Sequence, residues 1–232
     1  MVARITHPPD HLEMLKSNNR HQRRLAFNML AALLFVCTLP GLASAYTVNI
    51  TAGNPRAIYL QLGVGGFTGT YNGGGTPGNN TTVNLVSVTV PAAAVGTGAA
   101  QAMTTNSTVG PSSLDNFVFC NTPAQLYIGG FYRFNNNAIG AAATLTAISP
   151  ANLTSTAGDT IPFTQISWTS SGNSDSSAQP FPAGAFTGAT QTIGTIQRNQ
   201  WAESCHTFSY ANSAIRAAGT YNGRVTYTLT AP

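Results

Sequence analysis

The sequence predicts an all-β fold, in the form of an antiparallel β-sandwich, for residues 46–232. Apolar and polar residues alternate over many short segments of this region, as they do in half-buried strands. No window sustains apolar residues at i, i+3, i+4 and i+7, the pattern of an amphipathic helix. The polar residues are mainly Thr, Ser, Asn, Gln and Gly, which suit turns, and Val, Ile, Tyr and Phe between them favour pleated strands.

The strands expected from this alternation run along the whole region. They are Tyr46–Ile50, Ile58–Val64, Val86–Val90, Phe117–Phe119, Gln125–Ile128, Gly130–Phe134, Thr144–Ile148, Phe163–Ser170, Phe208–Tyr210 and Val225–Leu229. Short turns near Ala92–Met103 and Asn199–Cys205 are the only helical candidates. The pentapeptide Gly69–Gly73 recurs as Gly219–Gly223, and its Asn-Gly pair predicts a hairpin turn. We expect one domain over 46–232; the alternative is a duplication into two small β-lobes joined near 149–158.

Residues 1–45 predict a signal peptide. Three arginines, Arg20, Arg23 and Arg24, precede an apolar run at Leu25–Leu39, and the small residues Ala43–Ala45 form the expected cleavage site. The run of about 15 residues is shorter than the roughly 20 that span a bilayer. The polar stretch before the arginines indicates that translation starts at Met14. We therefore expect an exported protein, in the periplasm, on the cell surface or outside the cell, with no integral membrane segment after cleavage.

The charges that remain after this cleavage are few. Residues 46–232 hold no lysine, four acidic residues and five arginines, which are Arg56, Arg133, Arg198, Arg216 and Arg224. Nucleic-acid binding needs several cations gathered on one face to neutralise phosphates. Because these arginines are scattered along the chain, we expect no nucleic-acid partner.

Two cysteines, Cys120 and Cys205, follow the predicted leader. In an oxidising compartment they have one intramolecular pairing, which would close a loop of about 85 residues. The chain-entropy model gives such a bridge about 4–5 kcal/mol of stability. The alternative is a pair of buried free thiols.

Catalytic machinery is sparse, and we expect a protein that is not an enzyme and needs no cofactor or metal. The single histidine of this region, His206, lies beside Cys205, and no Gly-x-Ser-x-Gly elbow presents a serine to it. Glu203 with His206 would supply only two metal ligands. Trp168 lies in an expected strand and is predicted to be a core residue, whereas Trp201, with a polar flank, is the candidate for stacking on a ligand such as a sugar.

The terminal strand Gly219–Leu229, the Thr/Ser/Asn/Gly-rich β-region, the single disulfide and the leader together resemble bacterial exported pilin-type proteins, the spore-coat-U-like and archaic chaperone–usher pilin group. The resemblance implies an incomplete immunoglobulin-like sandwich that accepts an N-terminal strand from the next subunit. It also implies self-association into filaments, a periplasmic chaperone and an outer-membrane usher. Tyr46, Val48 and Ile50 would then fill pockets of a neighbour, unless Tyr46–Ile50 is an ordinary first strand within its own sheet.

The function expected from these observations is that of an exported structural or adhesive cell-surface protein. The main alternative is a soluble secreted glycan- or protein-binding module that uses Trp201 or the loop Gly65–Asn80. A secreted hydrolase that uses His206 is the less favoured alternative.

Overall fold

The computed structural model describes residues 47–54, 56–70, 82–135, 142–173 and 178–232. Contacts between Cα atoms divide the chain into two units, Met1–Leu42 and Ala43–Pro232, and every described residue belongs to the second. The predicted signal peptide therefore lies outside the described residues. Within them, no helix is long and apolar enough to cross a membrane.

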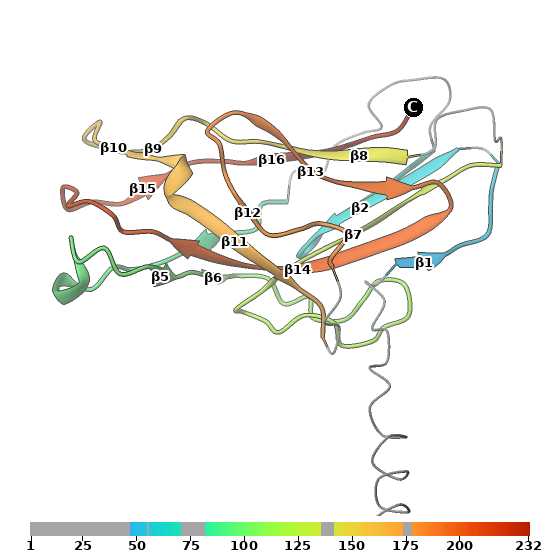
Figure 1. Ribbon diagram of the computed structural model, residues 1–232, viewed down its shortest axis with the longest axis horizontal. Coiled ribbons are helices and arrows are strands. Elements are labelled where there is room, and N and C mark those ends of the chain that lie inside the picture. The colour runs from blue at the N-terminus through green and yellow to red at the C-terminus, as the bar shows by residue number, and fades with distance from the viewer. Residues whose placement is uncertain (1–46, 55, 71–81, 136–141, 174–177) are drawn as a thin grey trace, which may run out of the picture. The chain divides into compact units, whose positions relative to one another are not determined.

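The largest sheet is entirely antiparallel and is built around one long strand, β14 (Gln200–Tyr210) (Figure 1). The order of its main path is β12 (Gly184–Ala185), β11 (Ile166–Ser171), β14, β7 (Leu126–Arg133), β2 (Ala57–Leu62) and β3 (Gly65–Thr70). Two short strands, β1 (Thr47–Asn49) and β5 (Gln101–Ala102), also pair with β14.

Three smaller antiparallel sheets complete the described part. One has the order β13 (Thr190–Gln197), β8 (Ala142–Ile148), β16 (Thr226–Thr230), and one has the order β10 (Thr160–Pro162), β9 (Asn152–Ser155), β15 (Tyr221–Asn222). The third pairs β4 (Val86–Ser87) with β6 (Thr104–Thr105). The described helical turns are two 3-10 segments, Ala92–Ala94 and Phe163–Gln165.

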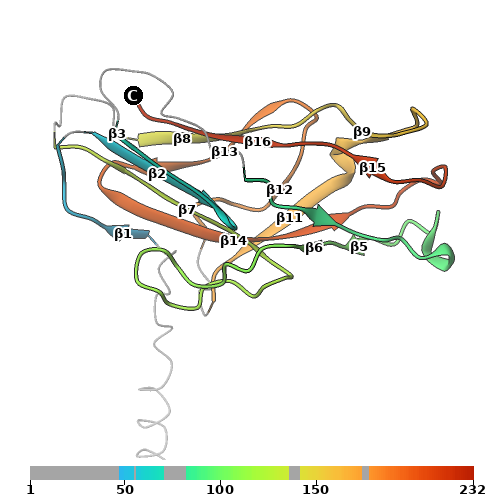
Figure 2. The same cartoon turned by 180° about the vertical axis from the view of Figure 1, so that it is seen from behind.

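The main hydrophobic core lies between the largest sheet and the β13–β8–β16 sheet, which the two views show as separate layers (Figures 1 and 2). Ile58, Ile128 and Phe208 reach it from the first sheet, and Leu145 and Ile196 from the second. Successive side chains of a strand point to opposite faces, so β14 presents Trp201 and Cys205 to its other face. A second core, which contains Phe119, Cys120, Tyr127, Trp201 and Cys205, covers that face.

The predicted β-rich, antiparallel fold with one disulfide is confirmed, and most expected strands are present. Several expectations are wrong. The predicted loop Gly65–Asn80 begins as strand β3, and its remainder, with the first Asn-Gly pair, lies outside the described residues. Phe117–Phe119 is not a strand, since only Val118 pairs, in an isolated antiparallel bridge with Pro111. Asn199–Cys205 opens the long strand β14 instead of forming a helical turn. Asn222–Gly223 does not form a hairpin turn, because Tyr221–Asn222 pairs with β9 and the chain then continues extended into β16. The sequence also failed to predict β13, whose polar residues alternate only weakly with apolar ones.

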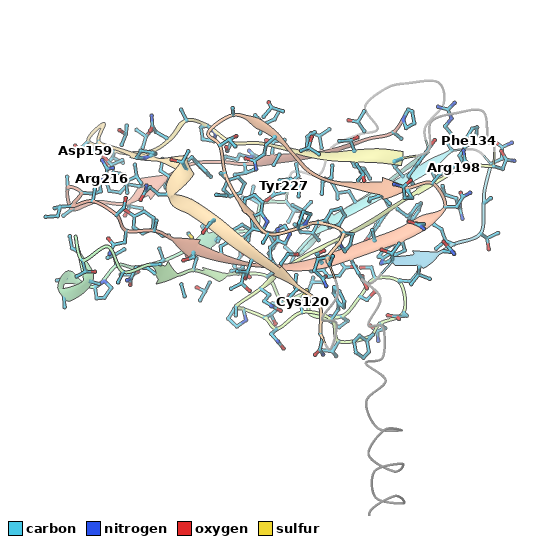
Figure 3. The ribbon with its side chains drawn as sticks, viewed as in Figure 1. Cys120, Phe134, Asp159, Arg198, Arg216 and Tyr227 are labelled. Atoms are coloured by element: carbon cyan, nitrogen blue, oxygen red, sulfur yellow. A yellow bond between two sulfur atoms is a disulfide. The ribbon has the colours of Figure 1, made fainter. Side chains whose placement is uncertain are left out.

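Cys120 and Cys205 form the predicted disulfide, with their Cα atoms 5.6 Å apart. Both residues are buried, and the bridge ties the loop that precedes β7 to the middle of β14. Figure 3 shows Cys120 at the edge of the ribbon where this loop meets the sheet. The disulfide therefore holds the cover of the second core in place.

We expect the double variant Cys120→Ser, Cys205→Ser to lose about 4 kcal/mol of unfolding free energy, because the bridge closes a loop with a sequence separation of 85 residues. Urea unfolding followed by far-UV circular dichroism measures this loss. Wild-type protein under strong reductant serves as the control and should approach the double variant. A difference under 1 kcal/mol between oxidised wild type and double variant would contradict the prediction.

Candidate functional site

The main core opens to the surface along an apolar groove with a volume of about 1370 Å³. One wall comes from the segment 82–90, the other from residues 219–229, and core side chains such as Phe163 and Phe208 lie at its base. Figure 3 labels two of the lining residues, Arg216 and Tyr227, which lie well apart along the molecule. The groove thus follows β15 and β16.

Both walls carry apolar side chains that are only partly buried. They pack against the main core while keeping one side in the groove, and they are Val86, Val88 and Val90 on one wall and Tyr221, Val225 and Tyr227 on the other, with Leu153 of β9 beside them. Fully burying a side chain of this size is worth about 1.5–3 kcal/mol. A contiguous apolar surface of this kind marks an interaction site in soluble proteins.

The groove also has unpaired strand edges. Among the described residues, β16 pairs with β8 alone, so its other edge has free backbone donors and acceptors beside the groove. The opposite wall pairs with β6 only at Val86–Ser87. An apolar floor between two open edges has the features that an additional β-strand requires.

Two asparagine side chains hold the wall at residues 82–90: Asn106 Oδ1 accepts from the Leu85 backbone N–H at 2.8 Å, and Asn84 connects the wall to the turn between β2 and β3. Asn84 Nδ2 donates to the Leu62 carbonyl at 2.7 Å, and its Oδ1 accepts from the Val64 backbone N–H at 3.0 Å. Gly63 makes these contacts possible, because it adopts a φ of 48° and a Cβ there would lie 2.2 Å from Asn84 Oδ1. The wall is therefore anchored to the turn between β2 and β3.

The residues predicted as a donor strand lie away from the groove of their own chain. Tyr46 is outside the described residues, while Val48 is paired opposite Trp201 and packs with Ile50 against the second core. The Ile50 N–H donates to the Asn199 carbonyl at 2.9 Å. In this chain the segment is an edge strand of the largest sheet, and its donation to a neighbour stays a prediction.

Trp201, the predicted stacking residue, is 4% exposed. Its ring centroid lies 5.6 Å from that of Tyr59 and 6.1 Å from that of Phe131, and its Nε1 donates to Glu203 Oε2 at 2.9 Å. In this arrangement the indole is a core side chain that leaves almost no ring surface for a ligand. Its stacking role stays a prediction that would require the covering residues to move.

Glu203 is a fully buried carboxyl group that sequence reasoning did not single out as a structural centre. Its Oε2 accepts hydrogen bonds from Ser112 Oγ at 2.8 Å, Trp201 Nε1 and the Tyr127 hydroxyl, whereas Oε1 has no hydrogen-bond partner. Burial raises the pKa of Glu203, and the three hydrogen bonds oppose this shift. Gly129, directly opposite Glu203, leaves room for this cluster, since a Cβ there would lie 2.2 Å from the Tyr127 hydroxyl.

His206 is buried on the face of β14 that points to the main core, beside Trp168, the predicted core tryptophan, which is 5% exposed. Its ring stacks on Trp168 with centroids 5.5 Å apart, and Nε2 lies 3.0 Å from the Phe181 carbonyl oxygen. Burial lowers the pKa of His206 to about 4. Ser170, directly opposite His206 in the sheet, donates its hydroxyl to the same Phe181 carbonyl at 2.6 Å, and His206 Nδ1 has no hydrogen-bond partner. In this arrangement the imidazole is a core side chain.

No family model, curated protein or solved structure matches the chain. Within the described residues, no group of three or more His, Cys, Asp and Glu side chains could hold a metal ion. The groove is thus the feature that carries a functional argument. Sequence reasoning missed it because its walls lie more than 100 residues apart in the chain; the one signal was Val86–Val90, a valine-rich alternation that pairs over only two residues.

We expect His206 to destabilise the wild type progressively as the pH drops from 6.5 to 4, because folded His206 resists a proton that the unfolded chain binds near pH 6.5. The shift of its pKa to about 4 corresponds to a loss of about 3 kcal/mol over this range. Urea unfolding at several pH values measures this as a difference: the unfolding free energy of wild type should fall by that amount relative to His206→Phe, which keeps the stack on Trp168. Parallel profiles for the two proteins would contradict the prediction.

Glu203 has the opposite pH dependence. Its pKa is raised, so its contribution to stability is greatest at low pH and declines as the pH rises above the ordinary value of 4.5. We expect Glu203→Gln to remove this decline and to unfold at a higher temperature than wild type at pH 8. Glu203→Asp is the control that retains the charge and the decline. Thermal scans at pH 5 and pH 8 measure both, and a lower melting temperature for Glu203→Gln at pH 8 would contradict this account.

Proposed function

We propose that the chain is an exported structural subunit of a cell-surface filament, which takes a β-strand from a neighbouring copy into its apolar groove. In this proposal residues 46–232 form an immunoglobulin-like sandwich that lacks one strand, after removal of the signal peptide. The observation that carries the proposal is the open groove between segment 82–90 and β16. An added strand would bury the exposed core and pair with the open edge of β16.

The dimensions of the groove suit a short strand. The edge of β16 offers five residues, Thr226–Thr230, which corresponds to about 16 Å of extended chain. The segment Tyr46–Ile50 has the same number of residues and places apolar side chains at every second position. Three side chains of a single face would thereby enter the groove, and the alternating polar residues would face outward.

A second copy of the chain is the occupant that we favour. The segment 46–50 follows the expected cleavage site and has no charged side chain, so its one charge is the α-ammonium group of Tyr46, at the end of the strand. The lining includes Arg216 and Arg224 but no acidic residue, which supports a neutral strand over a basic one. Repetition of this heterologous contact from copy to copy would build an open filament.

An uncovered groove with free strand edges is an aggregation hazard before assembly. We therefore include in the proposal a periplasmic chaperone that covers the groove and an outer-membrane usher that receives the subunit. A role in adhesion would follow from display on the filament.

We expect Val88→Asp to abolish filament formation, because it places a charge on the groove wall where a donated strand would be buried. The matched control is Ile148→Asp, since Ile148 is 49% exposed on β8 and does not line the groove. Negative-stain electron microscopy and analytical ultracentrifugation of the cleaved, chaperone-free protein measure assembly, with at least a tenfold loss expected for Val88→Asp alone.

A synthetic peptide of residues 46–54 should raise the melting temperature of the wild type by several degrees and leave that of Val88→Asp unchanged. A version of the peptide with serine at positions 48 and 50 is its control. A wild-type protein that stays monomeric at every concentration and ignores the peptide would overturn the proposed function.

A further inference from the structure

We propose that β1, paired with β14 of its own chain, is a latch that holds the donor strand in the free subunit and must open before assembly. This inference rests on the proposed function and concerns its regulation. It starts from the observation that the structure places Thr47–Asn49 at a site that is not the groove.

The latch is made of specific contacts. Thr47, Val48 and Asn49 pair with Ala202, Trp201 and Gln200, and Gln200 Nε2 donates to Asn49 Oδ1 at 3.2 Å. Val48 and Ile50 pack against the second core, where Trp201 is almost completely covered. The segment is thus ordered by backbone pairing, a side-chain hydrogen bond and apolar burial.

The same side chains cannot serve two sites at once. Val48 and Ile50 lie on one face of the strand, two residues apart, and this is the face that a groove would have to bury. While they contact the second core of their own chain, they are withheld from a neighbour. Docking on β14 and donation to another copy therefore exclude each other.

The latch is weaker than the contact that would replace it. It pairs three residues at a sheet edge, and Thr47, Val48 and Ile50 are only partly buried while Asn49 is exposed. The groove offers a longer edge and a core floor that is otherwise open. In the free subunit β1 therefore stays paired with β14 of its own chain. It leaves β14 when the groove of a neighbouring copy provides a stronger binding site.

Release of β1 would uncover Trp201, and this supplies a direct readout. The chain has two tryptophans, and Trp168 is buried in the main core, away from β1. In a Trp168→Phe variant, the emission of Trp201 should therefore lie at short wavelength in the monomer and shift to longer wavelength on assembly. No shift on assembly would mean that β1 does not cover Trp201 in the free subunit, and would overturn the latch.

A second arm closes the latch covalently through Asn49→Cys, Gln200→Cys. Directly opposed residues of antiparallel strands have Cα atoms about 4.5–5.5 Å apart, within the range that a disulfide bridges. Asn49 is exposed and Gln200 partly exposed, so mild reductant should open this bridge before the buried Cys120–Cys205 bridge. We expect at least tenfold less assembly when it is oxidised and recovery on mild reduction. The control Asn49→Ser, Gln200→Ser cannot form a bridge and also lacks the hydrogen bond between these residues, so it should assemble no later than wild type under either condition.

A third variant loosens the latch without touching the donor strand or the groove. Gln200→Ala removes the hydrogen bond to Asn49, and we expect its assembly to begin two- to fivefold sooner than that of wild type. If oxidised Asn49→Cys, Gln200→Cys assembled like wild type, or Gln200→Ala did not assemble sooner, the latch would be wrong. Loss of assembly in Val88→Asp would then still support the proposed function, whereas a wild type that never assembles would overturn both.

Discussion

The structure depends on one strand whose two faces are both buried. β14 gives Ala202 and Phe208 to the main core on one face and Trp201 and Cys205 to the second core on the other. Its neighbours β7 and β11 pair along its two edges, and β1 and β5 occupy the remaining edge positions. From Trp201 to His206 the strand has no solvent-facing side, so its polar side chains find their partners inside the protein. Glu203 Oε2 accepts three hydrogen bonds and His206 Nε2 contacts the Phe181 carbonyl, whereas Glu203 Oε1 and His206 Nδ1 have no partner.

These two buried ionisable groups have opposite consequences for stability. Burial penalises the charged form in each case, so it raises the pKa of the carboxyl and lowers that of the imidazole. Acid conditions favour the folded state through Glu203 and disfavour it through His206. Both effects arise in the cores around β14, because neither Glu203 nor His206 lines the groove. At the groove, the cost to folding is instead the apolar surface that stays in contact with water.

The all-β fold could be predicted because each strand is recognised from its own residues, by their alternation. The disulfide could be predicted because two cysteines allow only one pairing. β14 was recognised only at Phe208–Tyr210, because its first half, with Trp201, Glu203 and Cys205 on one face and Ala202, Ser204 and His206 on the other, does not alternate in polarity. A strand buried on both faces loses the period of two that identifies a half-buried one. The groove was beyond prediction for a different reason, since it depends on which distant segments fail to pair.

In the proposed assembly, the strand that would close the core beside β16 is β1 of a neighbouring copy. In the structure β1 is paired with β14 of its own chain, where Val48 lies opposite Trp201. When β1 moves from β14 to the groove of a neighbour, it exchanges one apolar contact for another. The equilibrium between the two states therefore depends on the difference between the two burial free energies. The hydrogen bond between Gln200 and Asn49 contributes to the closed side of this balance. Control of assembly would then lie in β14, far along the sequence from the strand that is exchanged.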